Sequence, residues 1–176
     1  ILVLGFVLWT GVRVVANKPS DDAAHMASKQ DYLRQVAALS GGTPRPNVLI
    51  FYYDDLGYGD LGFTGSTAIK TPNIEALAKS GTVLSNYYSP SPVCSPSRAA
   101  MLTGRLPPRA GVPDVQFPTG DPIGYLGHAG GFAGRLLAEE ITLADTLKAA
   151  GYRTGMIGKW HLGDRAPSLP GNFGFD

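Results

Sequence analysis

The central stretch of this 176-residue chain reads Cys94-Ser95-Pro96-Ser97-Arg98-Ala99-Ala100-Met101-Leu102-Thr103-Gly104-Arg105, and it holds the only cysteine of the sequence. Pro96 suits the first turn of a helix and good helix formers follow Arg98, so the stretch predicts a loop that enters a helix. Cys94 would lie at the helix N-terminus, where outward-facing backbone N–H groups favour negative charge. Arg98 follows four residues later on the same helix face. The thiol is therefore a small core group, a reactive group or a site of modification.

An apolar run of strand length lies upstream, at Val48–Tyr53, and favours a buried parallel strand. The run ends at Asp54 and Asp55, where the chain must turn. Two adjacent carboxylates repel each other unless a cation bridges them, and hard oxygen ligands suit calcium or magnesium. The alternative is a turn in which aspartate is used for its preference for loops.

Helices and strands are predicted to alternate along the rest of the chain. Cap and turn residues bound two more helices, one between Thr71 and Gly81 and one between Thr142 and Gly151. Apolar segments predict strands at 83–88 and 153–158. This order predicts the α/β class, with a sandwich around a mostly parallel sheet. Ligand sites in such folds lie at the carboxyl ends of the strands.

Two candidate site residues, Lys159 and His161, follow the last of these predicted strands. In extended chain, residues two apart point to the same face, with Trp160 pointing to the other. Lysine supplies a cation and histidine can carry a proton near neutral pH. The alternative is a solvated lysine and a surface histidine. His25 and His128 lie in a predicted linker and a glycine-rich loop, and neither is expected to be catalytic.

The composition indicates a globular protein, with 44% apolar and 16% charged residues. The net charge of +1 comes without a basic block and gives no case for nucleic-acid binding.

Residues 1–16 carry an apolar run that predicts a signal peptide or a signal anchor, with a buried strand as the alternative. Residues 17–45 are predicted as a linker or stem, in which 29–39 form either a short amphipathic helix or loose chain. Residues 111–134 predict a long surface loop near the mouth of the site.

Four motifs, in order, resemble the type I sulfatase family. The central stretch resembles its cysteine signature, and Pro46–Asp60 resembles its first strand and metal-binding turn. Thr71–Ala78 resembles its first helix, and Gly151–Gly163 its second signature. The residues of these motifs are most similar to those of the arylsulfatase A and N-acetylgalactosamine-6-sulfatase branch. Residues 46–176 are thus expected to be the N-terminal part of a sulfatase catalytic domain, an alkaline-phosphatase-like sandwich whose sheet is incomplete in this fragment.

The resemblance implies a mechanism for sulfate ester hydrolysis. In the family the cysteine corresponding to Cys94 is oxidised by a formylglycine-generating enzyme to Cα-formylglycine, whose hydrate attacks sulfur. The family pattern makes Asp54, Asp55 and residue 94 ligands of a divalent ion, Ca2+ with Mg2+ as the alternative, with further ligands beyond Asp176. Lys159 and His161 would bind the sulfate, with Arg98 and Lys159 countering charge and His161 assisting the release of sulfate. The implied substrate is a sulfate-ester small molecule or a sulfated sugar.

The resemblance also implies a place in the secretory pathway, where the protein would be lysosomal, extracellular or membrane-anchored, or periplasmic in a bacterium. Two alternatives stay open. One is a phosphomonoesterase or phosphonate hydrolase of the same superfamily, which shares the sheet and the metal-binding aspartates. The other is a non-catalytic fragment, and residues 1–176 by themselves are expected to be inactive.

Overall fold

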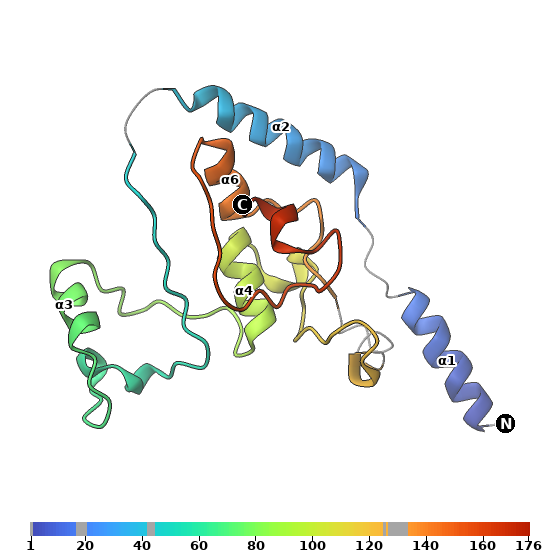
Figure 1. The fold of residues 1–176 in the computed structure, drawn as a ribbon. Helices are drawn as coiled ribbons and strands as arrows, with labels where there is room; N and C mark the ends of the chain where they lie inside the picture. The colour runs from blue at the N-terminus through green and yellow to red at the C-terminus, as the bar shows by residue number, and fades with distance from the viewer. Residues whose placement is uncertain (1, 17–20, 42–44, 125, 127–133) are drawn as a thin grey trace. The chain divides into compact units, whose positions relative to one another are not determined.

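A computed structural model of the chain describes residues 2–16, 21–41, 45–124, 126 and 134–176 (Figure 1). The chain divides into two compact units, of which the larger combines Ile1–Arg45 with Pro90–Asp176 and the smaller is Pro46–Ser89. The larger unit holds the helices α1 (Leu2–Ala16), α2 (Ala23–Leu39), α4 (Cys94–Thr103) and α6 (Leu143–Ala149). The smaller unit holds α3 (Pro72–Ser80). Short 3-10 turns follow at Tyr58–Asp60, Gly62–Thr64, Pro107–Ala110 and Pro170–Phe173.

A small apolar core organises the larger unit. Its fully buried members come from α4, from the turn after it and from the C-terminal segment, namely Ala99, Ala110, Val112, Leu136, Leu162 and Phe173. Leu102 and Trp160 pack against this cluster. Ala99 directly follows Arg98 and Leu162 directly follows His161, so burial of the core fixes the backbone beside two candidate site residues.

The helices predicted from local signals are confirmed. α6 begins at the predicted capping box, in which the Thr142 hydroxyl accepts from the Asp145 N–H while the Asp145 carboxylate accepts from the Thr142 N–H. Gly151 follows α6 with a φ of 89°. α4 begins at Cys94 with Pro96 in its first turn and ends at Gly104, which takes the left-handed conformation. Local cap and turn chemistry is therefore sufficient to set these boundaries.

The predicted strands do not form in the part of the chain that the structure describes. Val48–Tyr53 has no regular secondary structure and is exposed, with Leu49 at 77% and Phe51 at 71% of full exposure. The segments 83–88 and 153–158 are also without strand pairing. A parallel strand is stable when neighbouring strands pair with it and both sheet faces are covered. These segments have no such neighbours among the described residues, so the predicted central sheet is not formed there.

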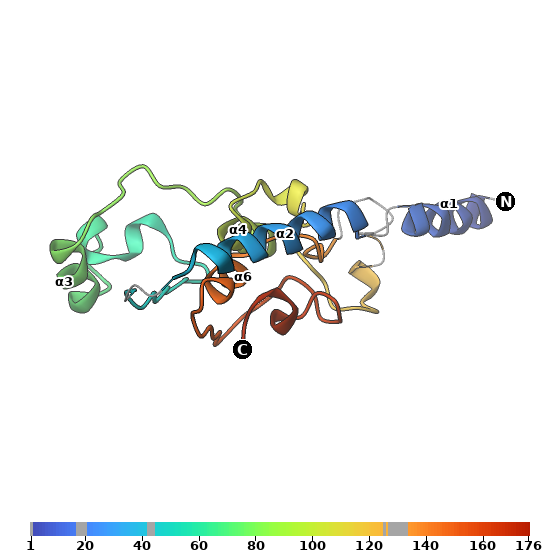
Figure 2. The ribbon, with the colours of Figure 1, turned by 90° about the horizontal axis from the view of Figure 1, so that it is seen from above.

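The N-terminal region is helical in two places. α1 has 15 residues, a length of about 22 Å at 1.5 Å per residue. None of the described helices combines the length and apolar character needed to cross a membrane. α2 begins at Ala23, earlier than the helix predicted over 29–39, because Asp22 caps it by accepting from two N–H groups. α2 packs against α6 (Figure 2).

Candidate active site

Four of the sequence-predicted site residues lie in the larger unit, where they are joined in two pairs. Cys94 and Arg98 come from α4, and Lys159 and His161 come from the segment after α6. The Cys94 Sγ atom lies 3.2 Å from His161 Nδ1. The Arg98 Nη1 atom donates to the Lys159 carbonyl oxygen at 2.7 Å. Cys94 and His161 are 67 positions apart in sequence, and Arg98 and Lys159 are 61 apart, yet each pair is in contact. The resemblance implies such contacts for a common site.

The histidine has one defined role for each ring nitrogen. His161 Nε2 lies 2.8 Å from the Gln116 carbonyl oxygen. A carbonyl oxygen can only accept, so Nε2 carries the proton and donates. In the neutral ring Nδ1 is then an acceptor, and the Cys94 thiol is its donor. The geometry places a proton-accepting nitrogen against the group that residue 94 carries.

Two residues that the sequence did not single out position this histidine. Ser95 is fully buried, and its Oγ accepts from the Gln116 N–H at 3.0 Å. Gln116 therefore receives a hydrogen bond from His161 through its carbonyl and makes one to Ser95 through its N–H. Sequence patterns carry no signal for Gln116, because it acts through its backbone. The signal for Ser95 is its place directly after Cys94, in the first turn of α4.

The segment that carries Gln116 is also fixed at its other end. The Thr119 Oγ1 and N–H groups donate to the Asp164 carboxylate at 2.6 and 2.7 Å. The Thr119 hydroxyl, followed by its N–H, holds the pKa of Asp164 below its usual value. Asp164 lies three residues after His161 in sequence, so the loop after Gln116 and the segment after His161 are held together.

Arg98 acts on the backbone of the second segment. Arg98 is 9% exposed, and its guanidinium donates a hydrogen bond from α4 to the Lys159 carbonyl oxygen. A hydrogen bond from a charged donor is stronger than a neutral one. The side chain of Lys159 is exposed, whereas Trp160 is half-buried and packs on Phe173 with ring centroids 5.7 Å apart. Lys159 and Trp160 therefore differ in their surroundings.

His161 has an unusual backbone conformation for a residue with a side chain. Its φ is 60°, in the left-handed region, and it lies between Gly158 with a φ of 110° and Gly163 with a φ of 136°. A Cβ added to Gly163 would lie 2.5 Å from the Ser168 Cβ, so this position needs glycine. The predicted extended geometry at His161 is therefore wrong. Left-handed backbone at non-glycine residues is concentrated at functional sites.

The two aspartates lie in the smaller unit, where the chain turns as predicted. Asp54 and Asp55 are exposed, and Asp55 has a φ of 55°. Their carboxylate oxygens are ligands of the kind that Ca2+ and Mg2+ take. Among the residues that the structure describes, no three His, Cys, Asp or Glu side chains gather to hold a metal ion. The carboxylate chemistry of these two aspartates fits a hard cation.

The other two histidines are placed differently. His25 lies exposed on α2, with Nδ1 3.2 Å from the Asp22 carboxylate. His128 lies outside the described residues, as does much of the glycine-rich loop around it.

Comparisons with known proteins agree on one family. A family model described as Sulfatase matches residues 46–176. The chain is 44% identical to arylsulfatase A of Bos taurus over 146 residues, which cover 81% of this chain and 26% of that protein. It is 42% identical to N-acetylgalactosamine-6-sulfatase of Homo sapiens over 137 residues, or 78% of this chain and 26% of that protein.

A solved structure is similar as well. The crystal structure of Ps i-CgsB in complex with k-i-k-neocarrahexaose matches with a TM-score of 0.60 and 40% identity, covering 70% of this chain and 25% of that one. The chain spans about a quarter of the length of the curated relatives it matches.

Proposed function

This chain belongs to the sulfatase family, and from that premise we propose that the protein carrying it hydrolyses sulfate esters, with Cys94, Arg98, Lys159 and His161 as its site residues. The observation that supports the proposal most is the contact of the Cys94 Sγ with His161 Nδ1 at 3.2 Å. These two residues come from the two separate motifs that resemble the sulfatase signatures. Their contact is what a shared catalytic site requires.

The proposed nucleophile is residue 94 after oxidation of its thiol to Cα-formylglycine by a formylglycine-generating enzyme. The hydrated aldehyde supplies two hydroxyls on one carbon, one to attack sulfur and one to release sulfate afterwards. His161 Nδ1 would take a proton from the group on residue 94, and the Gln116 carbonyl keeps the ring in the orientation for it. The Lys159 ammonium would bind a sulfate oxygen, and Arg98 would hold the Lys159 backbone and offset negative charge.

A divalent cation is proposed as the cofactor, Ca2+ with Mg2+ as the alternative. By the family motif, Asp54 and Asp55 would hold it together with residue 94 and with ligands outside this chain. The cation would supply Lewis acidity toward the group on residue 94. The adjacent carboxylates at the turn after residue 53 support this assignment through their charge and oxygen donors.

Fold, substrate and location are proposed on the same basis. The segments 48–53, 83–88 and 153–158 would become strands of a mostly parallel, alkaline-phosphatase-like sheet when neighbouring strands are present. Residues 46–176 would be the N-terminal part of that catalytic domain.

A sulfated sugar is one candidate substrate class, because a similar structure carries k-i-k-neocarrahexaose. The secretory pathway is the proposed location, with residues 1–16 as leader or membrane anchor.

Two measurements test the proposal. Mass spectrometry of the tryptic peptide that contains Cys94 should show replacement of sulfur and two hydrogens by one oxygen. Turnover of an aryl sulfate and an aryl phosphate by the protein carrying this chain should favour the sulfate. An unmodified thiol in active protein would refute the formylglycine nucleophile, and a large preference for the phosphate would show a phosphomonoesterase instead.

A further inference from the structure

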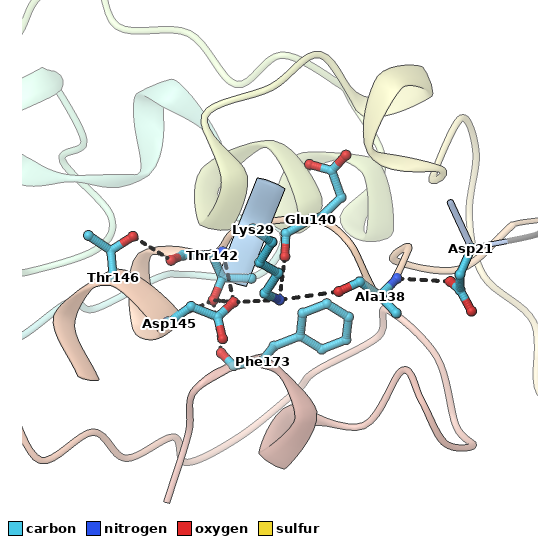
Figure 3. A network of polar contacts seen from close by, with 8 residues as sticks. All are labelled: Asp21, Lys29, Ala138, Glu140, Thr142, Asp145, Thr146 and Phe173. Carbon is cyan, nitrogen blue, oxygen red and sulfur yellow. Dashed lines mark hydrogen bonds and ion pairs between the residues drawn. The ribbon is translucent and has the colours of Figure 1, made fainter. Parts of the chain in front are cut away.

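Helix α2 precedes residues 46–176, which the sulfatase family model matches, and it carries a buried charge (Figure 3). Lys29 is 7% exposed, and its Nζ donates to the Glu140 carbonyl at 2.7 Å and the Ala138 carbonyl at 3.2 Å. The same atom lies 3.1 Å from the Asp145 carboxylate and 5.0 Å from the centre of the Phe173 ring. An ammonium group is buried at large cost unless it is paired and hydrogen-bonded in this way. The site for Lys29 is therefore fully formed.

A second contact fixes the start of the helix. The Asp21 carboxylate accepts from Arg135 Nη2 at 2.8 Å and from the Ala138 N–H at 3.0 Å. The hydrogen bond from Arg135 is the main reason why the pKa of Asp21 is below its usual value. Asp21 and Lys29 thus engage the N–H and the carbonyl of the same residue, Ala138. This pair of contacts defines one register of α2 on the segment 135–145.

The partners of Lys29 lead toward the candidate site. The Phe173 ring contacts both the Lys29 ammonium and the Trp160 ring, whose centroid lies 5.7 Å from that of Phe173. Trp160 Nε1 donates to the Ser168 carbonyl at 2.8 Å, which fixes the indole. Trp160 lies between Lys159 and His161 in sequence. The position of the indole therefore constrains the backbone on both sides of it.

We propose that Asp21 and Lys29 hold α2 in one fixed position on the segment 135–145, an arrangement that we call the clasp. We further propose that Lys29 is a positioning residue for Lys159 and His161 through Phe173 and Trp160. The clasp stands on the contacts of Asp21 and Lys29 alone. The positioning role rests on the proposed function, because only that function makes Lys159 and His161 site residues.

The capping box of α6 couples to the same clasp. The Asp145 carboxylate that pairs with Lys29 also accepts from the Thr142 N–H and hydroxyl at 3.0 and 2.9 Å. The Thr142 hydroxyl in turn lies 2.8 Å from the Phe173 carbonyl oxygen. Removing the Lys29 charge would leave the Asp145 charge buried without its cation. Loss of the Lys29 charge should therefore destabilise both the start of α6 and the packing of the Phe173 ring.

The test compares Lys29→Met with Lys79→Met in the full 176-residue chain, because Lys79 is an exposed lysine on α3. Both variants carry Trp9→Phe, so that Trp160 is the only tryptophan. Lys29→Met should lower the thermal midpoint by about 10 °C, since removal of one partner leaves a buried charge. It should also raise acrylamide quenching of Trp160 and speed amide exchange in the peptide 156–163. Lys79→Met should change none of these.

The outcomes separate the two parts of the proposal. A lower midpoint with unchanged Trp160 quenching and unchanged exchange at 156–163 would overturn the positioning role. Wild-type behaviour of Lys29→Met in all three measurements would overturn the clasp. If Lys29→Met does not fold, amide exchange in the wild-type chain decides, because a clasp requires α2 amides to be protected as strongly as those of α6. None of these readouts uses sulfate ester turnover, so an inactive enzyme would refute the proposed function and leave the clasp intact.

Discussion

The Cys94 Sγ atom lies 3.2 Å from Nδ1 of His161, so the only thiol of the chain faces the ring nitrogen opposite the one that donates to the Gln116 carbonyl. This relationship depends on a backbone carbonyl, and that carbonyl depends on the Ser95 hydroxyl. The contact therefore gives a way to test residues that act on Cys94 and His161 through the backbone.

Ser95→Ala should disturb the contact between Cys94 and His161. The substitution removes the acceptor for the buried Gln116 N–H, at a cost of about 1–3 kcal/mol in the free energy of unfolding. In the unmodified chain, the rate of Cys94 alkylation by iodoacetamide should fall about tenfold, because the thiol loses its aligned base. Ser95→Thr keeps the hydroxyl and should retain the rate.

Ser168→Ala is the matched control, because it also removes a fully buried hydroxyl, one that donates to the Leu136 carbonyl. It should lower stability without slowing alkylation. Equal alkylation rates in Ser95→Ala and the wild type would contradict the role of Ser95.

Arg98→Lys should destabilise the larger unit although the charge is kept. A lysine at this position cannot reproduce the planar guanidinium that reaches the Lys159 carbonyl at 2.7 Å. Loss of a hydrogen bond from a charged donor should lower the free energy of unfolding by about 1.5–3 kcal/mol, measured by urea denaturation. Arg153→Lys, at an exposed arginine, should change it little. The same result for both variants would show that the Arg98 contact is dispensable.

Glu140→Gln should change how stability depends on pH. Burial raises the pKa of Glu140 above its ordinary value of 4.5, against the opposing effect of Arg105, whose Nε lies 3.2 Å from the carboxylate. A raised folded-state pKa means that this group stabilises the fold below pH 4.5 and that the contribution is lost as pH rises through the raised value. The thermal midpoint of Glu140→Gln should therefore exceed that of the wild type at neutral pH. Below pH 4.5 the two should converge, and a lower midpoint for the variant at neutral pH would mean that the Arg105 ion pair dominates.

Metal removal should act through the aspartates of the smaller unit. In the protein carrying this chain, a chelator should abolish sulfate ester turnover and lower the thermal midpoint, and added Ca2+ should restore both. At a hundred times the dissociation constant, bound metal adds about 2.7 kcal/mol to stability. Asp54→Asn and Asp55→Asn should remove the Ca2+ response. Asp31→Asn, at an exposed aspartate on α2, should keep it. A Ca2+ response that survives in both aspartate variants would contradict their assignment as ligands.

Elements set by local chemistry could be predicted from sequence, whereas elements that need distant partners could not. The capping box at Thr142 and Asp145 is complete within four residues, and it marks the start of α6 correctly. Val48–Tyr53 has the composition of a buried strand, but a strand needs neighbours, and in this chain the segment is exposed.

The same distinction holds for the site. Cys94 and His161 could be predicted because their side chains carry the chemistry that the family motifs preserve. Gln116 acts through its backbone carbonyl, which has no sequence signature. Lys29 could not be predicted, because a lysine in a polar segment reads as solvated until its burial against Glu140 and Asp145 is known.

The φ of 60° at His161 limits which substitutions can test the chemistry of its side chain. Replacing histidine by alanine or valine changes the imidazole and the backbone energy together, because these residues rarely enter left-handed space. Asparagine enters it readily, so His161→Asn removes the proposed proton carrier while it keeps the turn. Comparing asparagine with alanine at this position would separate the conformational share of any lost activity from the acid–base share.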